Sequence, residues 1–183
     1  MTAAYPTPRP PLGALVAFDA AVRPRSPRLV GLACACTLGI SGAVRIGRLN
    51  GELARFGAAR GAMPFPFITV NPAISVLAWL AGGLGWILQV SNIAIYLEAL
   101  TDGLEPAAAD ITNFTASLLL LAPLWLTALH TARRIRTAQH LAGAPEQLGS
   151  PFRVALLTCL FPPAGLARLQ GELNRAWDPW RAP

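Results

Sequence analysis

Two long stretches without a charged residue constrain this chain more than any other feature. Ala73–Leu97 ends just before Glu98, and Ile111–Ala132 lies between Asp110 and Arg133. They are 25 and 22 residues long, and roughly 20 helical residues cross a hydrocarbon core of about 30 Å. A buried helix of a water-soluble protein rarely runs that far without a charge. The two stretches therefore predict an all-α integral membrane protein with two full transmembrane helices.

The composition agrees with this class. Charged residues make up 13% of the chain, about half of the ~25% in soluble globular proteins. The net charge of +6 raises the question of nucleic-acid binding. However, all fifteen basic residues are arginines that lie beside apolar runs, not in a separate basic domain. We therefore expect no nucleic-acid partner, and arginine without lysine indicates a GC-rich bacterial genome.

The arginines also predict the orientation in the membrane. They flank two shorter apolar runs, Leu29–Val44 and Val154–Ala167, whereas the segment 98–110 between the long helices contains only acidic charges. Arginine-rich flanks stay in the cytoplasm. We expect the acidic loop outside, and both termini on the cytoplasmic side of a bacterial inner membrane.

The two shorter runs are predicted to enter the membrane and return. As helices they would be only about 24 and 21 Å long, which is short of a full crossing. The first contains Gly39, Ser41 and Gly42, and the second contains Pro162-Pro163, residues that bend or break a helix. Re-entrant runs would leave all fifteen arginines on one side. The alternative is a four-helix transmembrane bundle with snorkelling arginines.

A nearly repeated phrase accompanies each short run, RLNGELARF at Arg48–Phe56 and RLQGELNRAW at Arg168–Trp177. Each phrase predicts an amphipathic interfacial helix, with arginines toward the headgroups. An ancient duplication explains the likeness; chance similarity of two Arg/Leu-rich helices is the alternative. The apolar stripes are Ile46, Leu49, Leu53 and Phe56, and Leu166, Leu169, Leu173 and Trp177. The residues expected to bind a partner protein or anionic lipid headgroups are Arg48, Glu52, Arg55, Arg168, Glu172, Arg175 and Trp177.

The long helices carry small residues at close-packing spacing and a few polar groups. Small residues four apart let helix backbones approach closely, and polar side chains can hydrogen-bond across a helical hairpin. The alternative for the polar groups is a vestibule for a transported solute. The packing candidates are Ala78, Ala81, Gly82 and Gly85, and the polar intramembrane candidates are Gln89, Asn92 and Asn113.

The chain thus divides into four segments. Residues 1–28 are Pro-rich with a short amphipathic helix, and residues 29–60 combine a short apolar helix with an amphipathic helix. Residues 73–132 form the transmembrane hairpin, and residues 133–183 contain a basic loop, a short apolar helix and the C-terminal amphipathic helix. Cys34, Cys36 and Cys159 have no histidine close by in the sequence, so we expect no metal site, no cofactor and no disulfide. No catalytic set is visible, and the chain is not expected to be an enzyme.

Most of the chain resembles a known family. TLGISGAVRIGRLNGELARF at Thr37–Phe56 and LQGELNRAWDPW at Leu169–Trp180 resemble motifs of the DUF4234 family of small bacterial membrane proteins. The resemblance covers the chain from Arg28 onward and departs from the family pattern at Ser41 and at Pro162-Pro163. It implies embedding in a membrane and, because the family's function is unknown, no activity.

These features favour a non-catalytic accessory or scaffold subunit of a larger bacterial membrane complex, with other membrane protein subunits as partners. The absence of catalytic residues and the small-residue packing faces are its basis. The alternatives are a membrane-shaping or lipid-binding protein, because paired shallow insertions would wedge one leaflet, and a component of a small-solute or proton channel.

Overall fold

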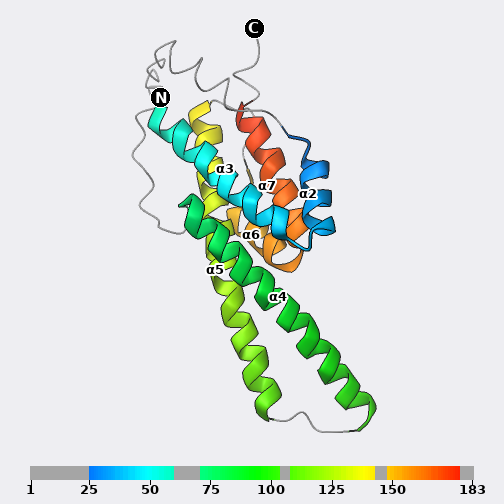
Figure 1. Cartoon of the computed structure of the whole chain (residues 1–183). Coiled ribbons are helices and arrows are strands. Elements are labelled where there is room, and N and C mark those ends of the chain that lie inside the picture. Colours follow the sequence, from blue (N-terminus) through cyan, green and yellow to red (C-terminus); the bar gives the residue numbers. More distant parts are fainter. Residues whose placement is uncertain (1–24, 60–70, 104–107, 143–147, 178–183) are drawn as a thin grey trace.

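The structure, a computed structural model, describes residues 25–59, 71–103, 108–142 and 148–177. Over these residues it contains six α-helices and no strand (Figure 1), which confirms the all-α class. The predicted helix within residues 1–24 and the chain after Trp177 lie outside the described residues. The helices are α2 (Pro27–Cys36), α3 (Ile40–Ala59), α4 (Pro72–Thr101), α5 (Ala108–Ala142), α6 (Pro151–Leu160) and α7 (Pro162–Trp177).

Helices α4 and α5 form a long antiparallel hairpin (Figure 1). Residues Pro72–Thr101 and Thr112–His140 are long and apolar enough to cross a membrane. Only 28% and 33% of their most apolar windows are buried within the protein. Two apolar helices of this chain could therefore cross a membrane, with most of their surface facing outward.

The first short apolar run does not form one helix. Helix α2 ends at Cys36, and α3 begins at Ile40 after a turn in which Leu38 (φ 47°) and Gly39 (φ 90°) are left-handed. The Gly39 N–H donates to Cys34 O at 2.8 Å, the bond that closes a helix end when a residue can adopt this conformation. Thr37 Oγ1 donates to Ala33 O at 2.8 Å and accepts from Ser41 N at 3.0 Å. The chain therefore reverses at the break expected near Gly39 (Figure 1).

The second short run breaks in the same way but by different chemistry. Helix α6 ends at Leu160, and α7 begins at Pro162. Prolines lack the N–H that would continue α6, and they are well suited to the first turn of a new helix. The Phe161 N–H donates to Leu157 O at 2.8 Å, and Phe161 O accepts from Gly165 N at 2.9 Å. In both short apolar runs, therefore, the first helix ends about halfway along the run, and the chain returns as an amphipathic helix.

Helices α2 and α6 are counterparts in length and start. Each begins with a Ser-Pro pair, at Ser26-Pro27 and Ser150-Pro151, and each is 10 residues long. Helix α2 packs against α7, where a Cβ on Gly31 would lie 3.0 Å from Pro163 O. Helix α6 packs against α5 and α7. The two short helices are therefore held by contacts with other helices of the same chain.

The four helices outside the hairpin, α2, α3, α6 and α7, gather around one half of it. We call this part the head: α2, α3, α6, α7 and the adjoining halves of α4 and α5. Residues 88–101 of α4 and 108–119 of α5 extend beyond it toward the connection between the two helices, and we call them the stalk (Figure 1). The buried apolar core lies in the head. The stalk carries exposed apolar side chains, among them Ile93, Ile95, Leu97, Leu118 and Leu119.

Gly82 and Gly83 offer a matched test of the α4–α5 contact. A Cβ on Gly82 would overlap the buried Leu124 side chain, whereas a Cβ on Gly83 would meet nothing within 4 Å. Gly82→Ala should destabilise the protein by about 1–3 kcal/mol through overpacking. Gly83→Ala should stabilise it by about 0.5–1 kcal/mol, because alanine loses less backbone entropy in a helix. Thermal unfolding in mild detergent measures both, and equal midpoints would contradict this packing.

Candidate functional site

The two copies of the repeated phrase meet inside the head. Phe56 on α3 and Trp177 on α7 pack edge to face, with ring centroids 4.7 Å apart. Every residue of the two apolar stripes is buried, with exposed fractions of 0–4%. The predicted interfacial position of these stripes is therefore wrong. The stripes form the protein core because each amphipathic helix buries its apolar face against the other copy and against α5.

A buried arginine joins the two copies. Arg45 on α3, 5% exposed, donates from Nε to Gln170 Oε1 on α7 at 2.6 Å. Its Nη1 pairs with Glu52 Oε1 at 2.9 Å. Glu52 lies about two turns further along α3, on the same face of the helix. A buried guanidinium is tolerated only when a counter-charge and hydrogen bonds replace its water. Arg45 therefore ties residues from both copies of the phrase to one charge.

Asn50, which corresponds to Gln170 in the repeat, forms a second polar contact in the same layer. It is fully buried, and its Nδ2 donates to Thr131 Oγ1 at 2.9 Å and to Ser75 Oγ at 3.1 Å. Ser75 belongs to α4 and Thr131 to α5. The first copy of the phrase is therefore hydrogen-bonded to both long helices.

Glu172 forms the third polar contact, from the second copy. It is 1% exposed and pairs with Arg168 Nη2 at 2.8 Å and Arg175 Nη1 at 3.2 Å. Gln139 on α5 donates from Nε2 to the Glu172 carbonyl at 2.9 Å and to Glu172 Oε2 at 3.1 Å. Gln139 Oε1 also accepts from Leu148 N at 2.6 Å. This amide therefore connects α5, α7 and the start of the segment that leads into α6.

The repeat is used asymmetrically. Glu172 pairs with Arg168 and Arg175, whereas Glu52 turns to Arg45. The position that corresponds to Arg45 in the second copy is Gly165, which packs directly against Thr158 of α6. There is no room for an arginine at that position. The sequence analysis missed Arg45, Ser75, Thr131 and Gln139, and the only signal for such contacts was the paired Asn50 and Gln170 in the phrase.

The predicted partner-binding residues separate into two groups. Glu172 and Trp177 lie in the interior and Glu52 is mostly covered, so these three are structural. The arginines remain outside. Nine described arginines have exposed side chains, and no described acidic side chain in the head does: Arg25, Arg28, Arg48, Arg55, Arg133, Arg136, Arg153, Arg168 and Arg175. The exposed Glu98 and Asp102 lie at the far end of the stalk.

The predicted packing and polar residues of the hairpin are used inside it. Gly82 and Gly85 lie against Leu124 and Leu120 of α5, and Ala78 is 6% exposed; Ala81 is half-buried. Asn92 Nδ2 donates to Ser117 Oγ at 3.5 Å, and Ser117 Oγ donates to Gln89 Oε1. The hydrogen bonds across the hairpin thus reach Ser117, while Asn113 is exposed.

The described residues contain no cluster of three or more His, Cys, Asp or Glu side chains that could hold a metal ion. Cys34, Cys36 and Cys159 are free thiols. The polar contacts in the head connect side chains of different helices to one another. This arrangement serves to hold helices together.

The chain matches no protein-family model, no curated protein and no solved structure. Its resemblance to the DUF4234 family stays a prediction.

The two glutamates of the phrase should differ in their effect on stability. Glu52→Gln leaves the buried Arg45 without a counter-charge and should destabilise the protein by about 3 kcal/mol. Glu172→Gln should cost about 1 kcal/mol, because Arg168 and Arg175 reach water and Gln139 can still hydrogen-bond to the new amide. Thermal unfolding of the two variants in mild detergent checks the order. A larger loss for Glu172→Gln would contradict the assigned role of Arg45.

Proposed function

We propose that this chain is a multi-pass protein of the bacterial cytoplasmic membrane that inserts more volume into one leaflet than into the other, and so bends the membrane. One observation carries the proposal. The short apolar helices α2 and α6 lie beside only one half of the α4–α5 hairpin (Figure 1). After each of them the chain turns back, into α3 and into α7.

The outer faces of these short helices are apolar and uncovered. Exposed fractions reach 66% for Leu29, 88% for Leu38 and 62% for Phe161. Together with the stalk they carry many exposed hydrophobic side chains, far more than a soluble monomer usually carries. Lipid is the solvent that suits such a surface. The other large hydrophobic side chains of α2, α3 and α6 that are exposed are Leu32, Ile40, Val44, Phe152, Leu156 and Leu160.

The depth of the turns supports insertion into one leaflet. Trp79 Nε1 donates to Gly39 O at 2.9 Å, so the first turn lies level with Trp79. Trp79 is seven residues into α4, or about 10 Å along the helix at 1.5 Å per residue. A hydrocarbon core of about 30 Å has a midplane near 15 Å. With Pro72 at the surface of the hydrocarbon core, a re-entrant element of this depth would enter its own leaflet and return.

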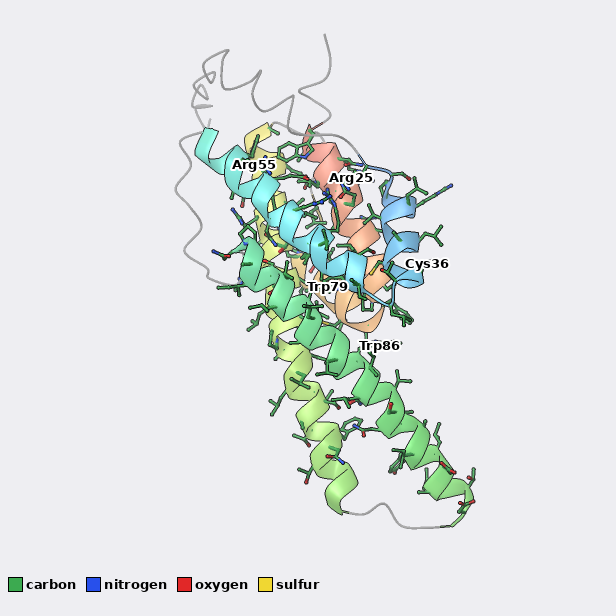
Figure 2. All side chains as sticks on the ribbon, in the orientation of Figure 1. Arg25, Cys36, Arg55, Trp79 and Trp86 are labelled. Carbon is green, nitrogen blue, oxygen red and sulfur yellow. The ribbon has the colours of Figure 1, made fainter. Side chains whose placement is uncertain are left out.

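The resulting cross-section differs between leaflets. The leaflet at the head would hold parts of all six described helices, whereas the other would hold only α4 and α5. The exposed arginines of the head belong on the cytoplasmic side, where anionic headgroups attract them. Arg25 and Arg55 lie at the end of the head away from the stalk, and Cys36 lies at the turn (Figure 2). This arrangement would expand the cytoplasmic leaflet.

Contacts that a scaffold subunit would offer to partners are made here within the chain. The glutamates of the phrase form ion pairs with arginines of the same chain, and the small residues of α4 pack against α5. A transport function has no added support, because Gln89 and Asn92 form hydrogen bonds with Ser117 within the hairpin. Membrane shaping is the function that the geometry favours.

Remodelling of vesicles tests the proposal. The purified protein should convert spherical vesicles of anionic phospholipid into tubules visible by electron microscopy. Leu38→Asp combined with Phe161→Asp should abolish this, because a charge within the bilayer costs about 3 kcal/mol per site. Both positions are exposed, so the head should still fold. Ala54→Asp on the outer face of α3 is the matched control, and tubulation by all three proteins would show that the turns do not insert.

Labelling of single cysteines in a Cys-free background tests the orientation. Cysteines at Ala58, Leu104, Ala142 and Pro179 meet a membrane-impermeant thiol reagent applied to intact bacteria. Only the Leu104 site should react, because arginine-rich flanks remain cytoplasmic. Labelling at Pro179 would instead favour four crossings.

A further inference from the structure

A half-open apolar groove lies where the turns of both re-entrant elements approach α4. Its volume is about 520 Å³, inside the range of about 300–1,000 Å³ for small-molecule sites. The lining comes from the end of α2, the face of α4 and the α6–α7 break. The residues are Cys34, Ala35, Leu38, Gly39, Trp79, Gly83, Trp86, Ile87, Leu124, Phe161, Pro162 and Pro163.

The floor of the groove is a slot between two indoles. Trp79 and Trp86 are seven residues apart on α4, which places them on one face of the helix two turns apart, and Figure 2 labels both near the turning end of α2. Gly83 lies between them, and a Cβ there would meet nothing within 4 Å. The groove therefore has open space along its floor.

The lining of this groove is predominantly apolar. The polar atom of the Trp79 side chain is already bonded to Gly39 O, and the prolines have no N–H to offer. The Cys34 thiol and the Trp86 indole N–H are the remaining polar side-chain groups of the lining residues. Along α4 the lining runs from Trp79 to Ile87, which corresponds to about 10–22 Å from Pro72. In the proposed orientation, that range includes the bilayer midplane, about 15 Å from the surface of the hydrocarbon core.

We infer that this groove binds one acyl chain of a phospholipid from the leaflet that holds the head. The groove opens beside exposed Leu38, Ile87 and Phe161, so it is continuous with the proposed lipid-facing surface. A bound chain would fill the space between the two re-entrant elements and join them to α4. The inference rests on the membrane insertion proposed above.

Quenching of tryptophan fluorescence by brominated acyl chains tests this inference. The reporter protein has Trp86, Trp125 and Trp180 replaced by Phe, which leaves Trp79 and the core Trp177. Trp79 lines the groove and is otherwise covered by the protein, so an acyl chain has to enter the groove to bring its bromines next to the Trp79 ring. In vesicles of phosphatidylglycerol with dibrominated chains, Trp79 should be quenched at least threefold more strongly than in the same protein with Gly83→Leu, which fills the slot.

Ala94→Leu, which adds the same bulk at an exposed site of the stalk, is the matched control and should leave the quenching of Trp79 unchanged. The Gly83→Leu protein should unfold at no lower temperature than its parent, since leucine is the better helix former. A separate reporter, Leu119→Trp, places an indole on the exposed stalk.

The outcomes separate the two proposals. Equal quenching of Trp79 with and without Gly83→Leu, or an unquenched Trp79 beside a quenched Leu119→Trp reporter, would overturn the acyl-chain site and leave membrane insertion standing. If Trp79 is unquenched beside a quenched Leu119→Trp reporter, and dimers can also be trapped by disulfides at the groove, the groove is assigned to a second copy of this chain. If neither reporter is quenched, the hairpin is not in the bilayer and both proposals fail.

Discussion

Wherever a helix ends away from water, its freed backbone groups must find partners within the protein, and the architecture of this chain depends on how its two reversals meet that requirement. The first reversal meets it with Thr37 and the left-handed Leu38 and Gly39. The second uses two prolines, which have no N–H to satisfy. Trp79 covers Gly39 O from α4. Because both reversals are locally satisfied, two short helices can stand beside one half of the hairpin and return on the same side.

A second requirement, the burial of Arg45, connects these reversals to the core. Arg45 follows the first reversal by about one and a half turns of α3, and it needs Glu52 and Gln170 together. Gln170 follows the second reversal on α7. One buried charge therefore sets how the two re-entrant elements lie relative to each other. The groove between them is a consequence, because Leu38 and Phe161 project from elements whose positions the core determines.

Membrane shaping and acyl-chain binding describe the same region of the protein. A head that is wide in one leaflet must remain wide under lateral pressure, and an open groove between its two elements is a place where it would yield. An acyl chain in the groove would add dispersion contacts with Trp79, Trp86 and Pro163. The lipid would then act as part of the wedge, and the arginines outside would select anionic headgroups above it.

The sequence by itself determined which segments are helical and where the chain reverses. Uncharged length specified α4 and α5, and Gly39 and Pro162-Pro163 specified where the short runs break, because these are local properties of the backbone. The destination of the amphipathic faces depended on tertiary structure. An apolar stripe is equally satisfied by lipid or by another stripe, so the sequence analysis placed Trp177 at the membrane surface, whereas it packs on Phe56. In the sequence, Arg45 looks like one more arginine flanking an apolar run. Its burial could not be predicted, because its partner Gln170 reaches it only when α7 packs against α3. Periodicity reports which face of a helix is apolar, and only packing decides what that face meets.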